Sequence, residues 1–155
     1  MQIDGEKFDF IKVRGEELYK SFEPIKCPYF NELVHFNAQG LDHLNYKRTD
    51  RERHEQDRYM RFKLLHLAPV ILKLTRTLQG FSSRNGFERV RRNGLNKSIA
   101  VERRYYEFIA IIDLVRVRII VKQIDNGPLM FWSIIPFWNR VGENRRMNFG
   151  DPEED

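Results

Sequence analysis

The spacing of apolar residues divides the chain into a helical first half and a strand-rich second half. Apolar positions recur at helical intervals in three segments, residues 14–22, 38–46 and 50–76. Pro24 and Pro28 end the first of these helices, because proline cannot continue a helical hydrogen-bond ladder. Pro69 divides the last segment in two, and the second of the resulting helices is predicted at Val70–Thr75.

Strands are predicted where the period shortens and β-branched and aromatic residues gather. A first short strand is expected at Glu32–Phe36. After Glu102 three segments bounded by turn residues are predicted to be antiparallel strands, residues 105–113, 116–124 and 129–136. Residues 87–92 are a candidate further strand.

An Asn-Gly turn fixes the register expected for the last two strands. With Asn126 and Gly127 as loop residues, Lys122 lies opposite Phe131 and Ile120 opposite Ser133. Since side chains alternate across a strand, one face is apolar and must face the core. It holds Val117, Ile119, Val121, Met130, Trp132 and Ile134. The other face holds Arg116, Arg118, Ile120, Lys122, Phe131 and Ser133.

The second of these faces has two interpretations. It is either an ordinary solvated sheet face or a surface on which cations hold a phosphate and Phe131 stacks on a base. No acid between Arg116 and Ile124 offsets the three positive charges there. Glu107 on the neighbouring strand is expected to point to the same side, where it either balances Arg118 or acts as a general base.

Four histidines offer proton-transfer or metal chemistry. They are His35, His43, His54 and His66, and no pair has the spacing of two ligands on one helix face, so no metal site is expected. His43 lies beside the apolar stripe of Leu41 and Leu44. It is either a helix-surface or capping residue, or a group that exchanges a proton during attack on phosphate.

Basic residues gather in two further segments. Residues 47–63 hold seven cations against four acids, and most fit the i,i+4 pairs of a solvated helix, as Asp57 and Arg61 do. Arg58 and Arg61 remain candidate phosphate ligands. Residues 84–104 hold seven cations against two acids and are expected to form a flexible basic loop along an RNA backbone.

Composition narrows the function classes. A chain of 155 residues is expected to form a single domain. The formal net charge is +5, and it is +9 without the four acids of residues 151–155, which favours a polyanionic partner. Cys27 is the only cysteine, and neither a signal peptide nor a membrane span is evident, so a cytoplasmic location without membrane contact is expected. Residues 142–155 are predicted to be a flexible, solvated tail.

Three blocks of sequence together resemble the barnase/EndoU/colicin/RelE-like (BECR-fold) nucleases, closest to their phage- and mobile-element-associated toxin members. The blocks are Val34-His35-Phe36-Asn37 with Gly40-Leu41-x-His43-Leu44, Arg61-Phe62-Lys63-Leu64-Leu65-x-x-Ala68-Pro69-x-Ile71-Leu72, and Val117 to Gln123 with Asn126-Gly127 and Phe131-Trp132-Ser133-Ile134-Ile135-Pro136. The match covers residues 29–136 as a nuclease-like core. Residues 1–28 fall outside it, as an N-terminal extension that is either a trimmed linker or an antitoxin-docking segment.

The resemblance implies an α+β fold in which N-terminal helices pack on a C-terminal antiparallel sheet of four to five strands. It also implies RNA cleavage through a cyclic phosphate without metal or cofactor, often by a toxin. Position by position, His43 would be the acid–base residue, Arg118 and Lys122 would stabilise the phosphate, and Ser133 would face the scissile phosphate. Lys47 matches a position that is often basic in these proteins.

The sequence therefore predicts a metal-independent endoribonuclease, with RNA as substrate and an acidic antitoxin or immunity protein as a further partner. His43, Glu107, Arg118, Lys122 and Ser133 are its predicted catalytic residues. The predicted RNA-binding residues are Lys47, Arg58, Arg61, Arg116 and Phe131. The alternatives are a non-catalytic RNA- or DNA-binding module and a regulator whose basic surface docks a partner protein.

Overall fold

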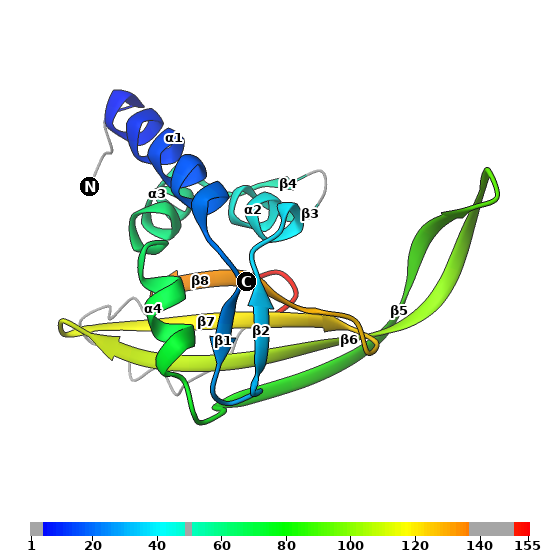
Figure 1. The fold of residues 1–155 in the computed structure, drawn as a ribbon. Coiled ribbons are helices and arrows are strands. Elements are labelled where there is room, and N and C mark those ends of the chain that lie inside the picture. The colour runs from blue at the N-terminus through cyan, green and yellow to red at the C-terminus, as the bar shows by residue number, and fades with distance from the viewer. Residues whose placement is uncertain (1–4, 49–50, 137–150) are drawn as a thin grey trace.

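The described part of the computed structural model, residues 5–48, 51–136 and 151–155, forms four helices and eight strands (Figure 1). The helices are α1 (Gly5–Ser21), α2 (Ala38–Asn45), α3 (Glu55–Leu64) and α4 (Leu67–Leu74). The strands are β1 (Ile25–Cys27), β2 (Glu32–His35), β3 (Tyr46–Arg48), β4 (Arg51–Glu52), β5 (Gly80–Arg92), β6 (Leu95–Ile112), β7 (Val115–Ile124) and β8 (Leu129–Pro136).

Six strands form one mixed sheet in the order β1-β2-β8-β7-β6-β5, and β3 and β4 form a separate pair. The α+β class is as predicted, but the sheet has more than four to five strands and is not wholly antiparallel. β2 runs parallel to β8, because it joins the far edge of the sheet from the first half of the chain through helical connections. β1 adds a strand of only three residues, Ile25–Cys27, too short for its pattern to be recognised.

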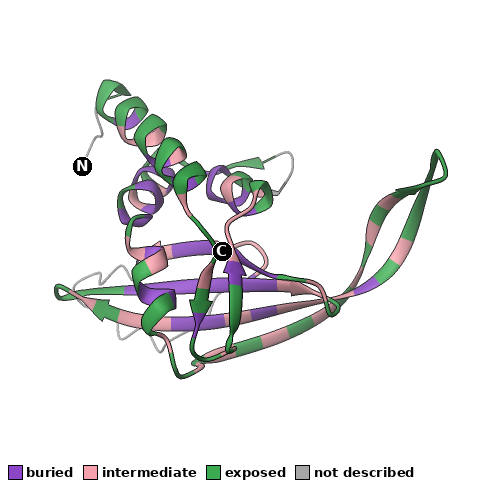
Figure 2. Cartoon of the chain, in the orientation of Figure 1, coloured by how far each residue is buried: buried purple, intermediate pink, exposed green. Residues whose placement is uncertain are grey.

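The two faces of the sheet have different roles. The core face carries apolar side chains of β6, β7 and β8, and the β1–β2 pair and α4 cross in front of it (Figure 1). Phe30, between β1 and β2, packs edge-on against Tyr106 and Phe108 of β6. We call the opposite side the site face; it holds Glu107, Arg118, Ile120, Lys122 and Ser133. The buried residues lie mainly around the centre of the sheet (Figure 2).

The first helix begins nine residues earlier than its apolar spacing predicts, at Gly5 rather than near Arg14. Phe8 is buried at its start, where the guanidinium of Arg58 lies 5.0 Å from the centre of its ring. Tyr19 and Cys27 belong to the hydrophobic core. The described part of residues 1–28 therefore packs with the rest of the fold.

Pro69 lies inside α4, and no new helix begins directly after it. It is the third residue of α4, a position where a missing backbone N–H breaks no helical hydrogen bond. The break between α3 and α4 falls at Leu65 and His66 instead. The second helix thus begins at Leu67, three residues before the predicted start.

Residues 84–104 form a regular hairpin where a flexible loop was predicted. β5 and β6 pair along all of β5, from Gly80 opposite Glu107 to Arg92 opposite Leu95. Asn93 and Gly94 have φ values of 52° and 74°, the positive values that tight hairpin turns require. The distal part, residues 84–101, which we call the arm, projects beyond the other strands and is largely exposed (Figures 1 and 2).

A β-bulge changes the predicted register of β7 and β8. Ile120 pairs with Ser133 as expected, but Val121 pairs with Phe131, so Trp132 is the extra residue of β8. The faces of the preceding β8 residues are therefore exchanged. Phe131 is fully buried in the core and is not on the site face as predicted. The connecting loop is longer than the two residues assumed, since β7 ends at Ile124 and β8 begins at Leu129.

Each helix in the described residues is too short or too polar to cross a membrane.

Candidate functional site

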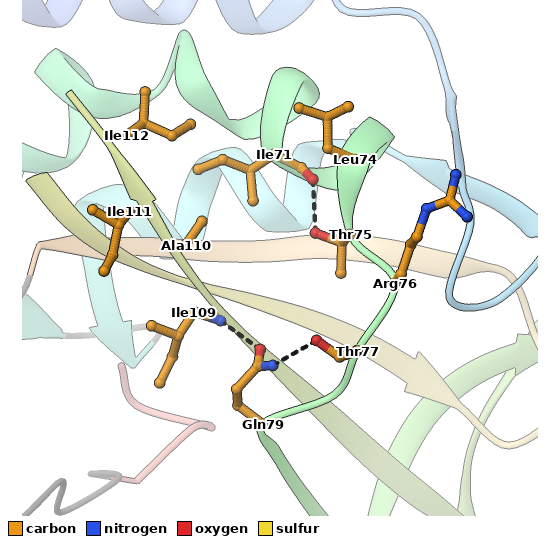
Figure 3. Close-up of a pocket in the computed structure, with 10 residues that line it drawn as sticks. All are labelled: Ile71, Leu74, Thr75, Arg76, Thr77, Gln79, Ile109, Ala110, Ile111 and Ile112. Atoms are coloured by element: carbon orange, nitrogen blue, oxygen red, sulfur yellow. Dashed lines mark hydrogen bonds between the residues drawn. The ribbon is translucent and has the colours of Figure 1, made fainter. Parts of the chain in front are cut away.

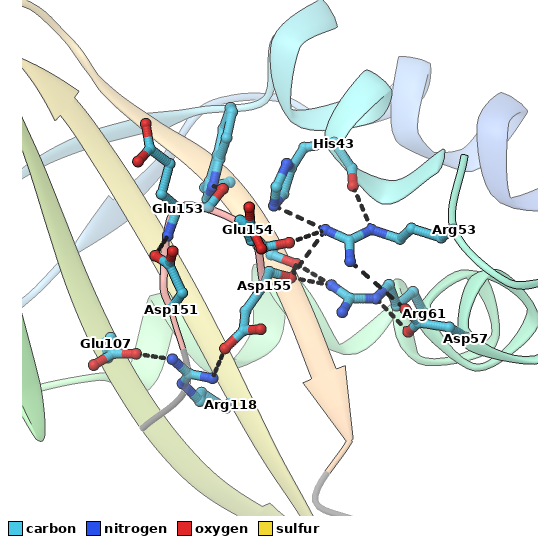
Figure 4. Close-up of polar contacts among 12 residues, drawn as sticks. His43, Arg53, Asp57, Arg61, Glu107, Arg118, Asp151, Glu153, Glu154 and Asp155 are labelled. Atoms are coloured by element: carbon cyan, nitrogen blue, oxygen red, sulfur yellow. Dashed lines mark hydrogen bonds and ion pairs between the residues drawn. The ribbon is translucent and has the colours of Figure 1, made fainter. Parts of the chain in front are cut away.

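Six residues singled out from the sequence meet on the site face. Glu107, Arg118, Lys122 and Ser133 come from the sheet, and His43 and Arg61 come from α2 and α3, which both pack against β8. Figure 4 shows His43, Arg61, Glu107 and Arg118. Arg118 and Lys122 are each only 6 % exposed and Ser133 is fully buried. The face is therefore not the ordinary solvated surface that was one interpretation of the sequence.

His43 is held by a ring and a guanidinium. Its imidazole stacks on Trp132, with the ring centres 4.0 Å apart and the planes 18° from parallel. Arg53 donates from Nε to the main-chain oxygen of His43 at 2.9 Å, and its Nη2 lies 3.0 Å from His43 Nε2. Because a guanidinium only donates, Nε2 must accept and we place the ring proton on Nδ1.

Burial and the surrounding cations keep His43 neutral. Burial is the larger cause, followed by the charges of Arg53, Arg61 and Lys122, and together they lower the pKa of His43 to about 2. At neutral pH the imidazole is therefore a proton acceptor and not an acid.

Arg61 and Ser133 form a short chain of donors. Arg61 donates from Nη1 to Ser133 Oγ at 2.5 Å, and from Nε to Asp57 Oδ1 at 2.6 Å. Asp57, one helical turn before Arg61, also lies 3.6 Å from Arg53. Asp57 thus orients both guanidiniums toward β8. Its i,i+4 contact with Arg61 is the one expected from the sequence.

Arg118 is paired with Glu107 on the neighbouring strand. The two form a buried ion pair, and each is less than a tenth exposed. Gly80 on β5 makes room for this carboxylate, since a Cβ at Gly80 would overlap it. Glu107 thus balances and orients Arg118, one of the two roles expected for it.

Lys122 lies over aromatic rings in a buried position. Its Nζ is 3.9 Å from the centre of the Trp132 ring and 5.8 Å from that of Tyr105. Burial is the main cause that lowers the pKa of Lys122 to about 8. The ammonium is therefore mostly charged at neutral pH but close to its titration point.

An acidic segment, Asp151–Asp155, lies on these cations (Figure 4). The Asp155 carboxylate accepts from Arg118 at 2.9 Å, and its main-chain oxygen accepts from Ser133 Oγ at 2.6 Å and from Arg61. Arg53 donates to the main-chain oxygen of Glu154 at 2.6 Å. This part of the predicted solvated tail is therefore seated on the protein, while residues 142–150 lie outside the described residues.

Other predicted RNA-binding residues lie away from this cluster. Arg58 donates to Asn45 and pairs with Glu52 at 2.8 Å, so it ties the helices together and does not face the sheet. Lys47 is on the separate β3–β4 pair. Arg116 shares the side of Arg118 but is exposed at the outer end of β7. Phe131 lies in the core, because the bulge at Trp132 exchanges the faces of the β8 residues before it.

Sequence patterns did not single out three residues of the site. Arg53 was one of many cations in a mixed-charge segment, and only the fold shows that it is 3 % exposed against His43. Trp132 was assigned to the core face, because a bulge leaves no clear mark in an apolar run. Tyr105 was taken as a strand residue without a role, although its parity with Glu107 placed it on the same side.

A second concave surface has no comparable chemistry. It lies at the edge of β6 beyond the start of β5, between Ile71 and Leu74 of α4 and Ile109 to Ile112 (Figure 3). Gln79 closes that edge by accepting from the backbone N–H of Ile109 at 2.8 Å. Among the described residues, Arg76 is the only ionisable one that lines it.

Comparison with models of known protein families, with curated proteins and with solved structures finds no match. Within the described residues, no group of three or more histidine, cysteine, aspartate or glutamate side chains is placed to hold a metal ion.

Proposed function

We propose that the chain is an endoribonuclease that cleaves RNA by attack of the 2′-hydroxyl on the adjacent phosphodiester, giving a cyclic phosphate. The observation that carries this proposal is the buried set of donors around a neutral imidazole. Arg61, Arg118 and Ser133 all donate to one acidic residue, Asp155. A phosphodiester presents the same kind of acceptor oxygens, for which guanidinium groups have matching geometry.

In the proposed complex the phosphate replaces Asp155. Arg61, Arg118 and Ser133 then donate to its non-bridging oxygens and stabilise the charge that grows there during attack. Glu107 keeps Arg118 in place. Lys122 is buried on β7, the strand that carries Arg118, and it adds a third positive charge to those of Arg61 and Arg118.

His43 is the proposed proton acceptor. The imidazole is neutral and can accept a proton, because burial and the neighbouring cations lower its pKa. In the proposed step Arg53, which donates to His43 Nε2 here, turns to the phosphate, and Nε2 takes the proton of the 2′-hydroxyl as the new oxygen–phosphorus bond forms. Lys122, with its pKa of about 8, gives a proton to the leaving 5′-oxygen as the old bond breaks.

The proposal implies a place of action and a kind of partner protein. An RNA-cleaving toxin acts where RNA is present, which makes the cytoplasm its expected place of action. The acidic segment on the site face favours an acidic inhibitor, since a partner protein with carboxylates at similar positions would pair with the same cations. An antitoxin or immunity protein of that kind would block the site.

Incubation of the purified protein with total RNA in the presence of EDTA tests the proposal. We expect cleavage by the unmodified chain and no cleavage of RNA that carries 2′-O-methyl groups. His43→Ala and Ser133→Ala are each expected to lower the rate by about 10²-fold or more. Arg118→Ala is expected to do the same, but it leaves Glu107 buried without its partner, so the double variant Glu107→Gln/Arg118→Gln checks the result.

Lys73→Gln, an exposed change on α4, serves as the control that removes a cation away from the site face. Circular dichroism of each variant shows whether it is folded. Full activity of the His43 and Ser133 variants would reject the proposed site. Intact RNA together with salt-sensitive binding would identify a non-catalytic nucleic-acid-binding module instead.

A further inference from the structure

A second group of donors lies on the same face, where the arm begins. Arg84 and Arg103 are opposite each other in the β5–β6 pairing, and Ser82 and Tyr105 are the next pair on the same side. Tyr105 in turn lies opposite Lys122 of β7. The site face therefore continues from Arg118 and Ser133 across β7 and β6 to the start of the arm.

Two arginines directly opposite each other are unfavourable unless an anion lies between them. Here the acidic segment supplies it. Arg84 Nη1 is 2.6 Å from Asp151 Oδ1 and 3.0 Å from Glu153 Oε2, while Arg103 Nη1 is 3.5 Å from Glu153 Oε1. Glu153 thus bridges the two guanidiniums.

Two buried hydroxyl groups lie beside these arginines. Ser82 Oγ is buried and has no hydrogen-bond partner among the described residues, which is costly for a hydroxyl. The hydroxyl of the fully buried Tyr105 lies beside the Glu153 carboxylate, the group that a phosphate would replace. Burial and the nearby Glu153 raise the pKa of Tyr105, so its hydroxyl keeps the proton that it can donate.

The local backbone also favours an open site here. A Cβ at Gly86 would overlap the guanidinium of Arg103, so the missing side chain lets this group lie across the strand. Arg103 is fixed in that position by Glu88 at 2.8 Å and by the main-chain oxygen of Phe87 at 2.8 Å. The guanidinium is therefore positioned before any ligand binds.

We propose that Arg84, Arg103, Ser82 and Tyr105 form a second phosphate subsite, which holds a phosphodiester of the same RNA chain beside the one that is cleaved. This inference rests on the proposed function. Glu153 and Asp155 occupy the two positions and are two residues apart, so their Cα atoms lie at most about 7 Å from each other, and their side chains reach the two groups of cations from there. Phosphates of one flexible strand can reach both groups in the same way.

The subsite also gives the bound strand a direction across the sheet. Trp132 donates from Nε1 to the main-chain oxygen of Glu153 at 3.2 Å, so the segment is held between the two positions as well. RNA on the same path would run from Ser133 on β8 across Lys122 to the root of the arm. A substrate with several phosphates is therefore favoured over a dinucleotide.

Binding of 2′-O-methyl oligouridylates to the full chain tests the subsite separately from cleavage, because these probes cannot be cut. A dinucleotide has one phosphodiester and fills one subsite, whereas a hexanucleotide can fill both. The measurements use a background with Asp151→Asn, Glu153→Gln and Asp155→Asn, which removes the carboxylates that pair with Arg84, Arg103 and Arg118 and so weakens competition by the segment. We expect Arg84→Gln/Arg103→Gln to weaken hexanucleotide binding about tenfold and to leave dinucleotide binding unchanged.

The control is Lys73→Gln/Arg76→Gln, which removes the same charge from exposed positions on the α4 side. The slope of log affinity against log salt is expected to flatten by about 0.7 in the subsite variant and not in the control. Tyr105→Phe, which keeps the ring, is expected to weaken hexanucleotide binding a few-fold. These readouts would not change if the arginines only stabilised the hairpin.

Equal hexanucleotide affinity of the subsite variant and the control would overturn the subsite. If unmodified RNA stays intact but the length-dependent loss is observed, the subsite stands and the cleavage proposal fails. If no variant distinguishes the two oligonucleotides, the subsite is rejected whatever the outcome of the cleavage assay.

Discussion

At the scale of single residues, burial decides the charge of the ionisable groups. His43 and Lys122 both have lowered pKa values, and for both the larger cause is removal from water. Their effects differ because one titrates far below neutrality and the other close to it. The neutral imidazole can accept a proton, and the lysine can hold or give one.

Lys122 should make the proposed RNA binding depend on pH. Its charge is lost as the pH rises through about 8, so affinity for a 2′-O-methyl oligonucleotide should fall between about pH 7 and 9. Because the folded-state pKa lies below the unfolded one, the contribution of Lys122 to stability rises over the range from about 8 to 10.5. Binding and stability are therefore expected to change in opposite directions.

Fluorescence anisotropy over this pH range checks the expectation, with denaturant unfolding in parallel. Lys122→Arg keeps its charge throughout and should give a nearly flat binding profile. An unmodified chain whose affinity is constant over the range would contradict the assigned role of Lys122.

At the scale of elements, the bulge in β8 and the arm of β5 and β6 shape the site. The bulge lets Trp132 stack on His43 while Phe131 fills the core. The arm carries four exposed cations, Arg89, Arg91, Arg92 and Lys97. No other described residue forms an ion pair with any of them. Such a strip favours contact with the backbone of a longer polyanion.

Replacing these four cations by glutamine is expected to weaken binding of long RNA about tenfold and to flatten its salt dependence. Dinucleotide binding should not change, because the arm projects away from α2 and β8, which carry His43 and Ser133 (Figure 1). Electrophoretic mobility-shift titrations at several salt concentrations provide the measurement. A loss of dinucleotide binding in the same variant would instead mean that the arm supports the fold of the site.

At the scale of the whole molecule, the acidic segment and the proposed substrate compete for the same cations. Asp151, Glu153 and Asp155 pair with Arg84, Arg103 and Arg118. RNA can therefore bind only when this segment leaves. The fold thus contains an internal competitor for the ligand that we propose.

Neutralising the segment with Asp151→Asn, Glu153→Gln and Asp155→Asn should raise RNA affinity about three- to tenfold. The same changes should lower the free energy of unfolding by about 1–2 kcal/mol, since buried Arg118 loses an anionic partner. Anisotropy and denaturant unfolding measure the two effects. Weaker RNA binding by a folded variant would show that the segment assists the ligand.

Local pattern was enough to predict a helical first half and a strand-rich second half, the positions of β7 and β8, and the side of the sheet that carries Arg118, Lys122 and Ser133. Strand alternation is a local property with a period of two residues, so it can be followed along the sequence. The same reasoning placed Glu107 beside Arg118, and the structure confirms that pair.

Only the tertiary structure brought Arg53 and Arg61 to His43, moved Phe131 into the core and seated the acidic segment on the site face. The bulge depends on packing on both sides of β8, which no single strand pattern contains. Long-range ion pairs depend on which segments meet in space. The i,i+4 pair of Asp57 and Arg61 could therefore be predicted, but the distant partners of residues 47–63 and 151–155 could not. The site face itself was therefore predictable, whereas the partners that hold it were decided by the fold.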